Sequence, residues 1–316
     1  MPESQAGEHA LVSGASGLVG SPVVEALLAG GYRVTRLVRD DGGGKSQSSV
    51  RWDATGADAE NRELRDFLAA SPVDIVVHLA GAPVFSLWTP TQKKRIRDSR
   101  VMGTQRLATA LANAARKPRV MVCASAIGYY GNRGDEVLTE ASGPGKGFLA
   151  QTSIDWEAAA QPARDAGIRV VNLRIGVVLS SNGGALKPML PAFKVGLGGR
   201  LGSGRQWMSW IALDDLARVI QFAIAHGELA GTINAVAPSP VTNSDFSGAL
   251  AKTLKRPSFF GVPEFLVRMA PGGMGEEALL SSERVIPERL LKSGFEFDHP
   301  ELREALAAII KHRGSP

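Results

Sequence analysis

The stretch His9–Asp40, HALVSGASGLVGSPVVEALLAGGYRVTRLVRD, decides the fold class of this 316-residue chain. It has the pattern of a buried strand, a turn that carries Gly14, Gly17 and Gly20, and a helix that leads to a second strand. Gly14 permits the tight turn, Gly17 lets the backbone approach a pyrophosphate, and Gly20 lets the helix pack closely on the strand. The helix N-terminus adds free N–H groups and a positive dipole end. The stretch therefore predicts dinucleotide binding.

Short apolar runs rich in Val and Ile alternate with helical patterns from here onward. Strands are expected at His9–Ser13, Tyr32–Val38, Val50–Trp52, Val73–Leu79, Arg119–Cys123 and Ile168–Leu173, and helices at Val19–Ala29, Glu60–Ala70, Arg97–Ala115 and Leu149–Ala166. Strands this apolar are covered on both faces, which is typical of parallel sheets. The alternation predicts an α/β fold of the Rossmann type, with a doubly wound parallel sheet.

After Ser180 the pattern loosens, and Gly and Pro interrupt it repeatedly before a strand, helix and strand return. The returning elements are expected at Ser209–Leu213, Asp214–His226 and Thr232–Val236. We predict a Rossmann domain over residues 1–180, rejoined by 209–237. Residues 181–208 and 238–316 are expected to form a smaller α/β substrate domain at the C-terminal side.

Composition narrows the possible partners. The net charge of +5 is spread along the chain apart from the run Lys93–Arg97, whereas nucleic-acid binders concentrate their basic residues. The single cysteine, Cys123, excludes an internal disulfide and suits a reducing compartment. No run approaches the ~18 apolar residues of a membrane span, and the start of the chain lacks a signal-peptide pattern. We expect a cytoplasmic protein with a small-molecule substrate, no nucleic-acid or membrane partner and no metal site.

The end of the second strand bears on the choice of cofactor. An acidic residue there binds the ribose 2′-hydroxyl of NAD, whereas an arginine suits the 2′-phosphate of NADP. Arg39, with Arg36 on the same strand and Lys45 nearby, favours NADP(H), because a guanidinium can bind a phosphate through two hydrogen bonds. Asp40 keeps NAD as the alternative.

Further motifs carry a family resemblance. They are HLAGAP (His78–Pro83), SRVMGTQRLATAL (Ser99–Leu111) and SAIGYYG (Ser125–Gly131), each placed after or near a predicted strand. Together with the glycine turn, they resemble an extended short-chain dehydrogenase/reductase. The segments 173–217 and 234–257, and RVIPERLLKSGFEFDHPELREAL at 284–306, are similar to an atypical branch described as epimerase family proteins.

This resemblance implies NADP(H) bound across the strand ends, with substrate between the two domains. Carried onto this chain, the implied cofactor-binding residues are Gly14, Ser16, Gly17, Leu18, Val19, Arg39, Leu79, Ala80, Gly81, Arg100 and Val178. Arg100 stands where most extended members have Asn. It is interpreted as a cofactor or phosphate contact, and the alternative is an arginine that caps a helix or pairs across a loop.

The catalytic residues of the wider family are absent from their usual positions. That family uses Ser, Tyr and Lys, and the resemblance places Ala126, Leu149 and Ser153 at the three positions. The chain has only three tyrosines, and none is followed four residues later by Lys. Either another residue moves the proton, or no reaction occurs.

The remaining catalytic candidates lie in the loop after the fifth strand, which borders the ligand crevice in doubly wound folds. They are Tyr129, Tyr130 and Ser125. On the substrate side, the resemblance places Met208 where sugar-nucleotide enzymes have a pyrophosphate-binding Arg. Met208, Trp207 and Trp210 form either an apolar, aromatic wall or part of the core. We expect an NADP(H)-dependent oxidoreductase or epimerase-type enzyme acting on a small, fairly apolar substrate. The alternative is an NADP(H)-binding sensor or regulatory protein without catalysis.

Overall fold

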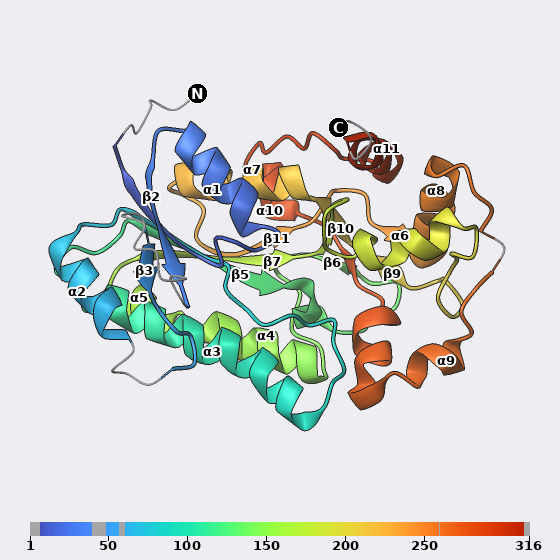
Figure 1. The fold of residues 1–316 in the computed structure, drawn as a ribbon, viewed down its shortest axis with the longest axis horizontal. Coiled ribbons are helices and arrows are strands. Elements are labelled where there is room, and N and C mark those ends of the chain that lie inside the picture. Colours follow the sequence, from blue (N-terminus) through green and yellow to red (C-terminus); the bar gives the residue numbers. More distant parts are fainter. Residues whose placement is uncertain (1–6, 40–48, 57–60, 259, 313–316) are drawn as a thin grey trace.

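A seven-stranded parallel sheet forms the centre of the protein in a computed structural model that describes residues 7–39, 49–56, 61–258 and 260–312. Its strands run in the order β11-β7-β5-β4-β1-β2-β3 (Figure 1). They are β1 (His9–Ser13), β2 (Arg33–Val38), β3 (Ser49–Arg51), β4 (Ile75–His78), β5 (Val120–Ala126), β7 (Arg169–Ile175) and β11 (Gly231–Ala235). The order reverses between β1 and β4, which places a ligand crevice at the carboxyl ends of these strands.

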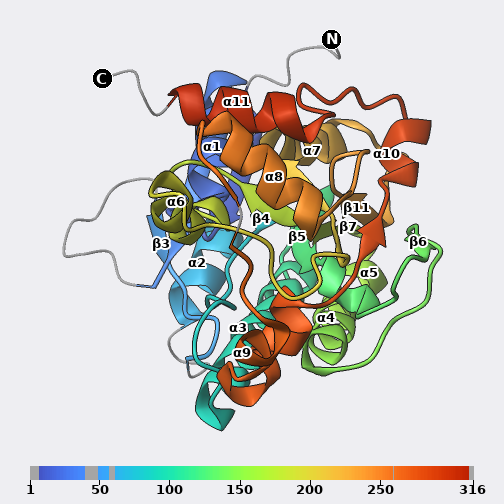
Figure 2. The ribbon, with the colours of Figure 1, turned by 90° about the vertical axis from the view of Figure 1, so that its right-hand side faces the viewer.

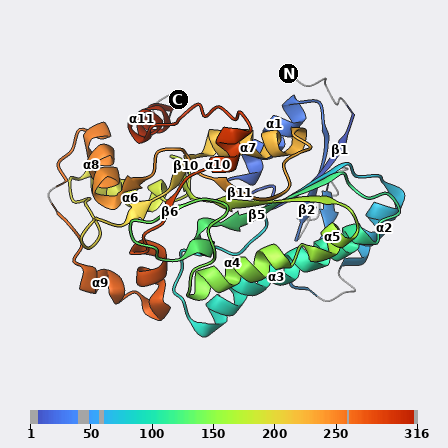
Figure 3. The same cartoon turned by 180° about the vertical axis from the view of Figure 1, so that it is seen from behind.

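Helices cover both faces of the sheet, as the apolar strands require. The helices α1 (Gly20–Ala29) and α7 (Leu213–Ala225) lie on one face. The other face carries α2 (Arg62–Ala70), α3 (Pro90–Ala112), α4 (Phe148–Ala158) and α5 (Gln161–Asp165) (Figure 3). Every residue of β1 and β4 is buried, and Cys123 is buried in β5. The predicted doubly wound α/β fold is confirmed.

The rest of the chain packs beside the carboxyl edge of the sheet (Figure 2). It contains the short strands β6 (Val137–Leu138), β8 (Val177–Leu179), β9 (Trp207–Met208), β10 (Trp210–Ala212), β12 (Val241–Thr242) and β13 (Arg284–Val285), which pair as β10-β8, β12-β9 and β13-β6. Its helices are α6 (Leu186–Lys194), α8 (Asn243–Thr253), α9 (Glu264–Arg268), α10 (Glu288–Lys292) and α11 (Leu302–His312), with short helical turns at Ile127–Tyr130 (η2), Pro271–Gly273 (η3) and Gly275–Leu279 (η4). Residues of α6, α8 and α11 share one apolar core. The division into two domains stays a prediction.

Two helices differ from the sequence prediction. The third helix was expected from Arg97 but starts at Pro90, because Thr89 caps it by accepting a hydrogen bond from Gln92 N–H and proline suits the first helical turn. The helix predicted over Leu149–Ala166 is two helices, α4 and α5. Pro162 has no N–H to continue the hydrogen-bonding ladder, so the chain breaks there.

One returning strand also differs. The strand predicted at Ser209–Leu213 is β10, and it pairs with β8 outside the large sheet. The last predicted strand, Thr232–Val236, is β11 and does join the large sheet, next to β7. Among the described residues, no helix is both long enough and apolar enough to cross a membrane.

Candidate active site

The glycine turn after β1 is packed too tightly for a side chain at Gly14 or Gly20. Gly14 has a φ of +68°, and a Cβ on it would come within 2.8 Å of the Leu79 carbonyl carbon. A Cβ on Gly20 would come within 2.0 Å of the Gly14 carbonyl oxygen, so only glycine lets α1 begin this close to β1. Gly17 N–H donates to Gly14 O at 2.9 Å and closes the turn.

The N-terminus of α1 is open to an anion. It has no side-chain cap and no acidic residue in its first turn, so the N–H groups there have no competing carboxylate. Ser16 and Gly17 are exposed, while Leu18 and Val19 are half-buried. A helix end of this kind, with a glycine turn before it, can bind a phosphate through backbone N–H groups and its dipole.

Segments that follow different strands of the large sheet approach this turn. Leu79, after β4, lies against Gly14, and a Cβ on Gly184 would come within 2.4 Å of the Val178 carbonyl oxygen in β8 and 3.3 Å of the Leu18 side chain. The Leu18 side chain lies so close to Gly183 that a Cβ there would come within 2.7 Å of it. The structure therefore brings together residues that the sequence assigned separately to the cofactor, and their role as cofactor contacts remains a prediction.

A buried histidine supports the loop after β4, and the sequence analysis did not single it out. Ser13 Oγ accepts hydrogen bonds from Leu79 N–H at 3.2 Å and Ala80 N–H at 3.4 Å, so its own hydrogen points to His78 Nδ1 at 2.6 Å. His78 Nε2 then donates to Thr104 Oγ1 at 3.0 Å. Burial lowers the pKa of His78 to about 4, so the ring is neutral at physiological pH. Only its place in the HLAGAP motif hinted at a role.

Arg100 lies directly behind the same loop. Its Nη1 donates to Ala82 O at 2.9 Å and Ile96 O at 3.1 Å, and a Cβ on Gly81 would come within 3.2 Å of the guanidinium carbon. Burial lowers the pKa of Arg100 to about 10, which leaves it charged at neutral pH. These bonds correspond to the alternative of an arginine that pairs across a loop. They also place a positive charge beside Gly81.

Arg39 directly follows β2 and is exposed. Asp53 follows β3, the neighbouring strand. Hydrogen bonds from Thr55 N–H are the main cause that lowers the pKa of Asp53, and the charge of Arg39 contributes. Asp40 and Lys45, the other residues considered for cofactor choice, lie outside the described residues. Arg39 is therefore an exposed cation at the end of the strand that reads the adenosine ribose in such folds.

The catalytic candidates surround a buried ion pair between Arg174, on β7, and Glu157, on α4. Arg174 Nε and Nη2 donate to the two carboxylate oxygens of Glu157 at 2.8 and 2.9 Å, and Ser125 Oγ donates to the same carboxylate at 2.8 Å. Arg174 Nη1 also donates to the Tyr130 hydroxyl at 2.9 Å. Burial acts to lower the pKa of Arg174, but the Glu157 carboxylate outweighs it and raises that pKa.

This network occupies two of the three predicted catalytic hydroxyls. Ser125 is 3% exposed and donates to Glu157, and Tyr130 is completely buried and donates to Asn234 Oδ1 at 2.7 Å. Neither hydroxyl can reach a substrate in this arrangement. Tyr129 is half-buried, and the Arg174 guanidinium lies 3.3 Å from its ring centroid. Of the three candidates, Tyr129 alone combines a partly accessible side chain with a place in the crevice loop.

The α4 helix carries Leu149 and Ser153 at the positions where the resemblance implies Tyr and Lys, and Glu157 follows one turn later. From the C-terminal part of the chain, Glu277 Oε2 accepts a hydrogen bond from Leu149 N–H at 2.9 Å. A carboxylate at this helix end is favourable to the helix dipole. Glu277 therefore ties the C-terminal segment to the start of α4.

Glu283 is a second group that the sequence analysis missed. Burial raises its pKa to about 7, although Ser281 Oγ donates to it at 3.2 Å and opposes the shift. Its backbone N–H donates to Trp207 O at 3.2 Å, so it lies beside the predicted substrate wall. Met208 in that wall is half-buried, and its sulfur accepts from Asn243 Nδ2. No motif marks Glu283, because its pKa depends on packing between distant segments.

Known proteins share this architecture over nearly the whole chain. A model of the NAD dependent epimerase/dehydratase family matches residues 10–235, and a domain of unknown function, DUF1731, matches residues 262–309. An epimerase family protein of Mycobacterium bovis is 43% identical over 296 residues, covering 93% of this chain and 95% of that protein.

Solved structures agree with these matches. The crystal structure of human epimerase family protein SDR39U1 (isoform 2) with NADPH has a TM-score of 0.84 and 32% identity, covering 96% of this chain and 99% of that chain. A UDP-glucose 4-epimerase of Thermus thermophilus in complex with NAD has a TM-score of 0.76 at 20% identity, covering 98% of this chain and all of that chain, and shows the shared fold alone.

The fold and these likenesses define an NAD(P)-binding fold of the short-chain dehydrogenase/reductase class. The chain belongs to the NAD dependent epimerase/dehydratase family, and its C-terminal part carries the DUF1731 domain.

Proposed function

We propose that this protein binds NADP(H) and catalyses an oxidoreductase or epimerase-type reaction on a small, fairly apolar substrate. The single observation that carries the proposal is the uncapped α1 N-terminus behind a turn in which Gly14 and Gly20 have no room for a Cβ. The human relative in complex with NADPH supports it. A bound nicotinamide would supply hydride transfer, and the protein would supply binding, orientation and proton movement.

The preference for NADP(H) over NAD(H) rests on Arg39. Its exposed guanidinium at the end of β2 suits a 2′-phosphate, whereas a nearby carboxylate would suit a free ribose hydroxyl. Asp53 is the described carboxylate whose pKa the Arg39 charge helps to lower, and its oxygens already accept from Thr55 N–H at 2.8 Å. Arg39 is therefore better placed to bind the 2′-phosphate of NADP(H) than Asp53 is to accept a hydrogen bond from the ribose 2′-hydroxyl of NAD(H).

Titration calorimetry with NADPH and NADH tests the cofactor. Losing one charge-assisted hydrogen-bonding group costs about 1.5–3 kcal/mol, so Arg39→Ala should weaken NADPH roughly 10- to 100-fold and change NADH about twofold or less. Arg33→Ala is the matched control, since Arg33 is exposed at the opposite end of the same strand. Equal losses for both cofactors would remove Arg39 as the phosphate ligand, and no heat from either would defeat the binding proposal.

Proton transfer is assigned to Tyr129 and Glu283. Tyr129 offers a hydroxyl on a half-buried ring that packs against the Arg174 guanidinium, and Glu283 has a carboxyl whose pKa is raised to about 7. When carbonyl compounds are screened with NADPH, the wild type should oxidise NADPH faster than the Gly14→Ala variant, in which the added Cβ would collide with Leu79 and disturb the cofactor turn. Tyr129→Phe or Glu283→Gln should then lower kcat more than cofactor affinity, and unchanged kcat in both would contradict the assignment.

A non-catalytic sensor is the second candidate, and the engagement of Ser125 and Tyr130 in the ion-pair network favours it. A sensor would bind NADPH stoichiometrically, change conformation at the DUF1731 domain and show no turnover. Reproducible turnover that is lost in Gly14→Ala would exclude it.

A further inference from the structure

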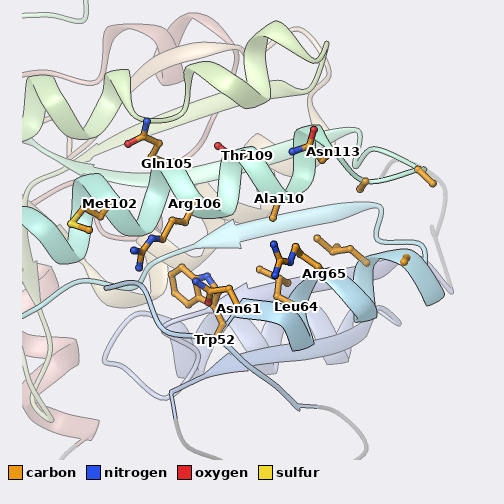
Figure 4. Close-up of a pocket in the computed structure, with 14 residues that line it drawn as sticks. Trp52, Asn61, Leu64, Arg65, Met102, Gln105, Arg106, Thr109, Ala110 and Asn113 are labelled. Carbon is orange, nitrogen blue, oxygen red and sulfur yellow. The ribbon is translucent and has the colours of Figure 1, made fainter. Parts of the chain in front are cut away.

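A pocket of about 620 Å³ lies between α2 and α3, on the outer layer of helices (Figure 4). None of the residues that line it belongs to the glycine turn or to the loops after β4 and β7 that form the candidate cofactor site. Its volume falls within the range of small-molecule sites. The pocket is thus a separate feature of the fold.

The pocket is elongated and has an apolar floor. Its lining residues on α3 run from Met102 to Ala110, which at 1.5 Å per residue spans about 12 Å, and Asn113, Ala114 and Ala115 extend the lining just beyond the end of α3. Leu64 and Leu68 of α2 line it together with Ala110 and Ala114, whose small side chains leave space open. A long, narrow, aliphatic floor suits an extended hydrocarbon chain better than a flat ring system.

One end of the pocket is polar and positively charged. Figure 4 shows Arg106, Trp52 and Asn61 gathered there. Arg106 Nη1 donates to Ala54 O at 3.3 Å, which leaves further N–H groups of its fork for another acceptor. The described lining includes two arginines and no Asp or Glu. Among the described lining residues, the charge at this end is positive, which favours an anion.

A second observation points to a missing hydrogen-bond acceptor at the same end. Trp52 is 3% exposed, and its indole N–H has no hydrogen-bond partner among the described residues. Buried donors are normally paired, because an unsatisfied one costs free energy. A carboxylate bound near Arg106 would supply an oxygen that could accept a hydrogen bond from the Trp52 indole N–H.

We propose that the α2–α3 pocket binds an amphipathic monocarboxylate of the fatty-acid class, with its carboxylate at Arg106 and its alkyl chain along Leu64, Leu68, Ala110 and Ala114. The carboxylate pairs with a guanidinium fork, and the chain removes apolar surface from water. This site is independent of NADP(H) binding and of any reaction in the crevice.

Calorimetric titration of the full chain with decanoate, with and without saturating NADPH, tests the proposal. Saturable binding with a Kd below about 1 mM, unaffected by competition from NADPH, is expected. Arg106→Gln should weaken decanoate at least tenfold, whereas Arg95→Gln, an exposed arginine of the same helix outside the pocket, should change it less than about twofold.

Filling the pocket should abolish binding. Ala110→Phe places a ring over the floor, and Thr109→Phe, at an exposed lining position, is a second filling variant that disturbs packing less. NADPH titration of each variant reports whether the chain is folded. Decanoate affinity that stays at the wild-type level in both folded filling variants, or in Arg106→Gln, would overturn the proposal, as would the absence of saturable binding to the wild type.

Discussion

Replacement of Glu157 by Gln should destabilise the protein strongly, because it leaves the Arg174 cation without its counter-charge inside the fold. The two side chains are 12% and 4% exposed, and two hydrogen bonds of 2.8 and 2.9 Å join them. Breaking a buried ion pair by removing one partner typically costs about 3–5 kcal/mol. Such a loss lowers the melting temperature by roughly 10 °C in a chain of this size.

Urea unfolding of four proteins measures this effect: the wild type, Glu157→Gln, Arg174→Gln and the double variant. Two neutral amides can still hydrogen-bond to each other, so the double variant should be within about 1–2 kcal/mol of the wild type. The coupling energy of the cycle should then reach at least about 2 kcal/mol. A cost below about 1 kcal/mol for Glu157→Gln alone would refute the view that Arg174 is held charged in a dry site.

Other changes give further expected outcomes. Gly20→Ala should abolish NADPH binding and lower the melting temperature, because its Cβ would lie 2.0 Å from the Gly14 carbonyl oxygen. Gly248→Ala should instead stabilise the protein by about 0.5–1 kcal/mol in urea unfolding, since it lies exposed inside α8 with nothing near its Cβ. Folding lowers the pKa of His78 from 6.5 to about 4, so between these pH values the unfolded chain is protonated at His78 and the folded chain is not. The free energy of unfolding is therefore at its full value above pH 6.5 and should fall by about 2 kcal/mol from pH 7 to pH 5. An NMR titration in which the His78 ring protonates above pH 6 would contradict this pH dependence.

The strands of the large sheet and the glycine turn could be predicted from the sequence because both depend on local patterns. Continuous apolar runs such as Ile75–His78 are typical of strands covered on both faces, and a glycine turn between strand and helix is typical of dinucleotide binding. Helix ends were harder. The start of α3 at Pro90 depends on a Thr89 cap before an irregular, weakly amphipathic segment, and the break before Pro162 divides a continuous helical pattern.

The site could be predicted only in part, because its chemistry depends on which distant side chains meet. The tyrosines at 129 and 130 are adjacent in sequence, yet one is buried against Asn234 and the other packs on Arg174. The sequence did not predict the Arg174–Glu157 pair, because the partner of an arginine inside an apolar strand is known only once α4 is packed against β7. The raised pKa of Glu283 is likewise a product of packing.

The Glu157–Arg174 pair limits what chemistry the crevice can perform. A guanidinium with a raised pKa stays protonated throughout the physiological range, so Arg174 can orient Tyr129 and attract negative charge but cannot exchange a proton. By the family resemblance a lysine would stand on α4 where this chain has Ser153, whereas Arg174 lies on strand β7. Any proton must therefore come from a group other than Arg174, and Tyr129 and Glu283 are the groups proposed for this step. A pH profile of kcat that follows a single group near pH 7 and disappears in Glu283→Gln would assign that proton to Glu283, and a profile unchanged in that variant would remove Glu283 from the step.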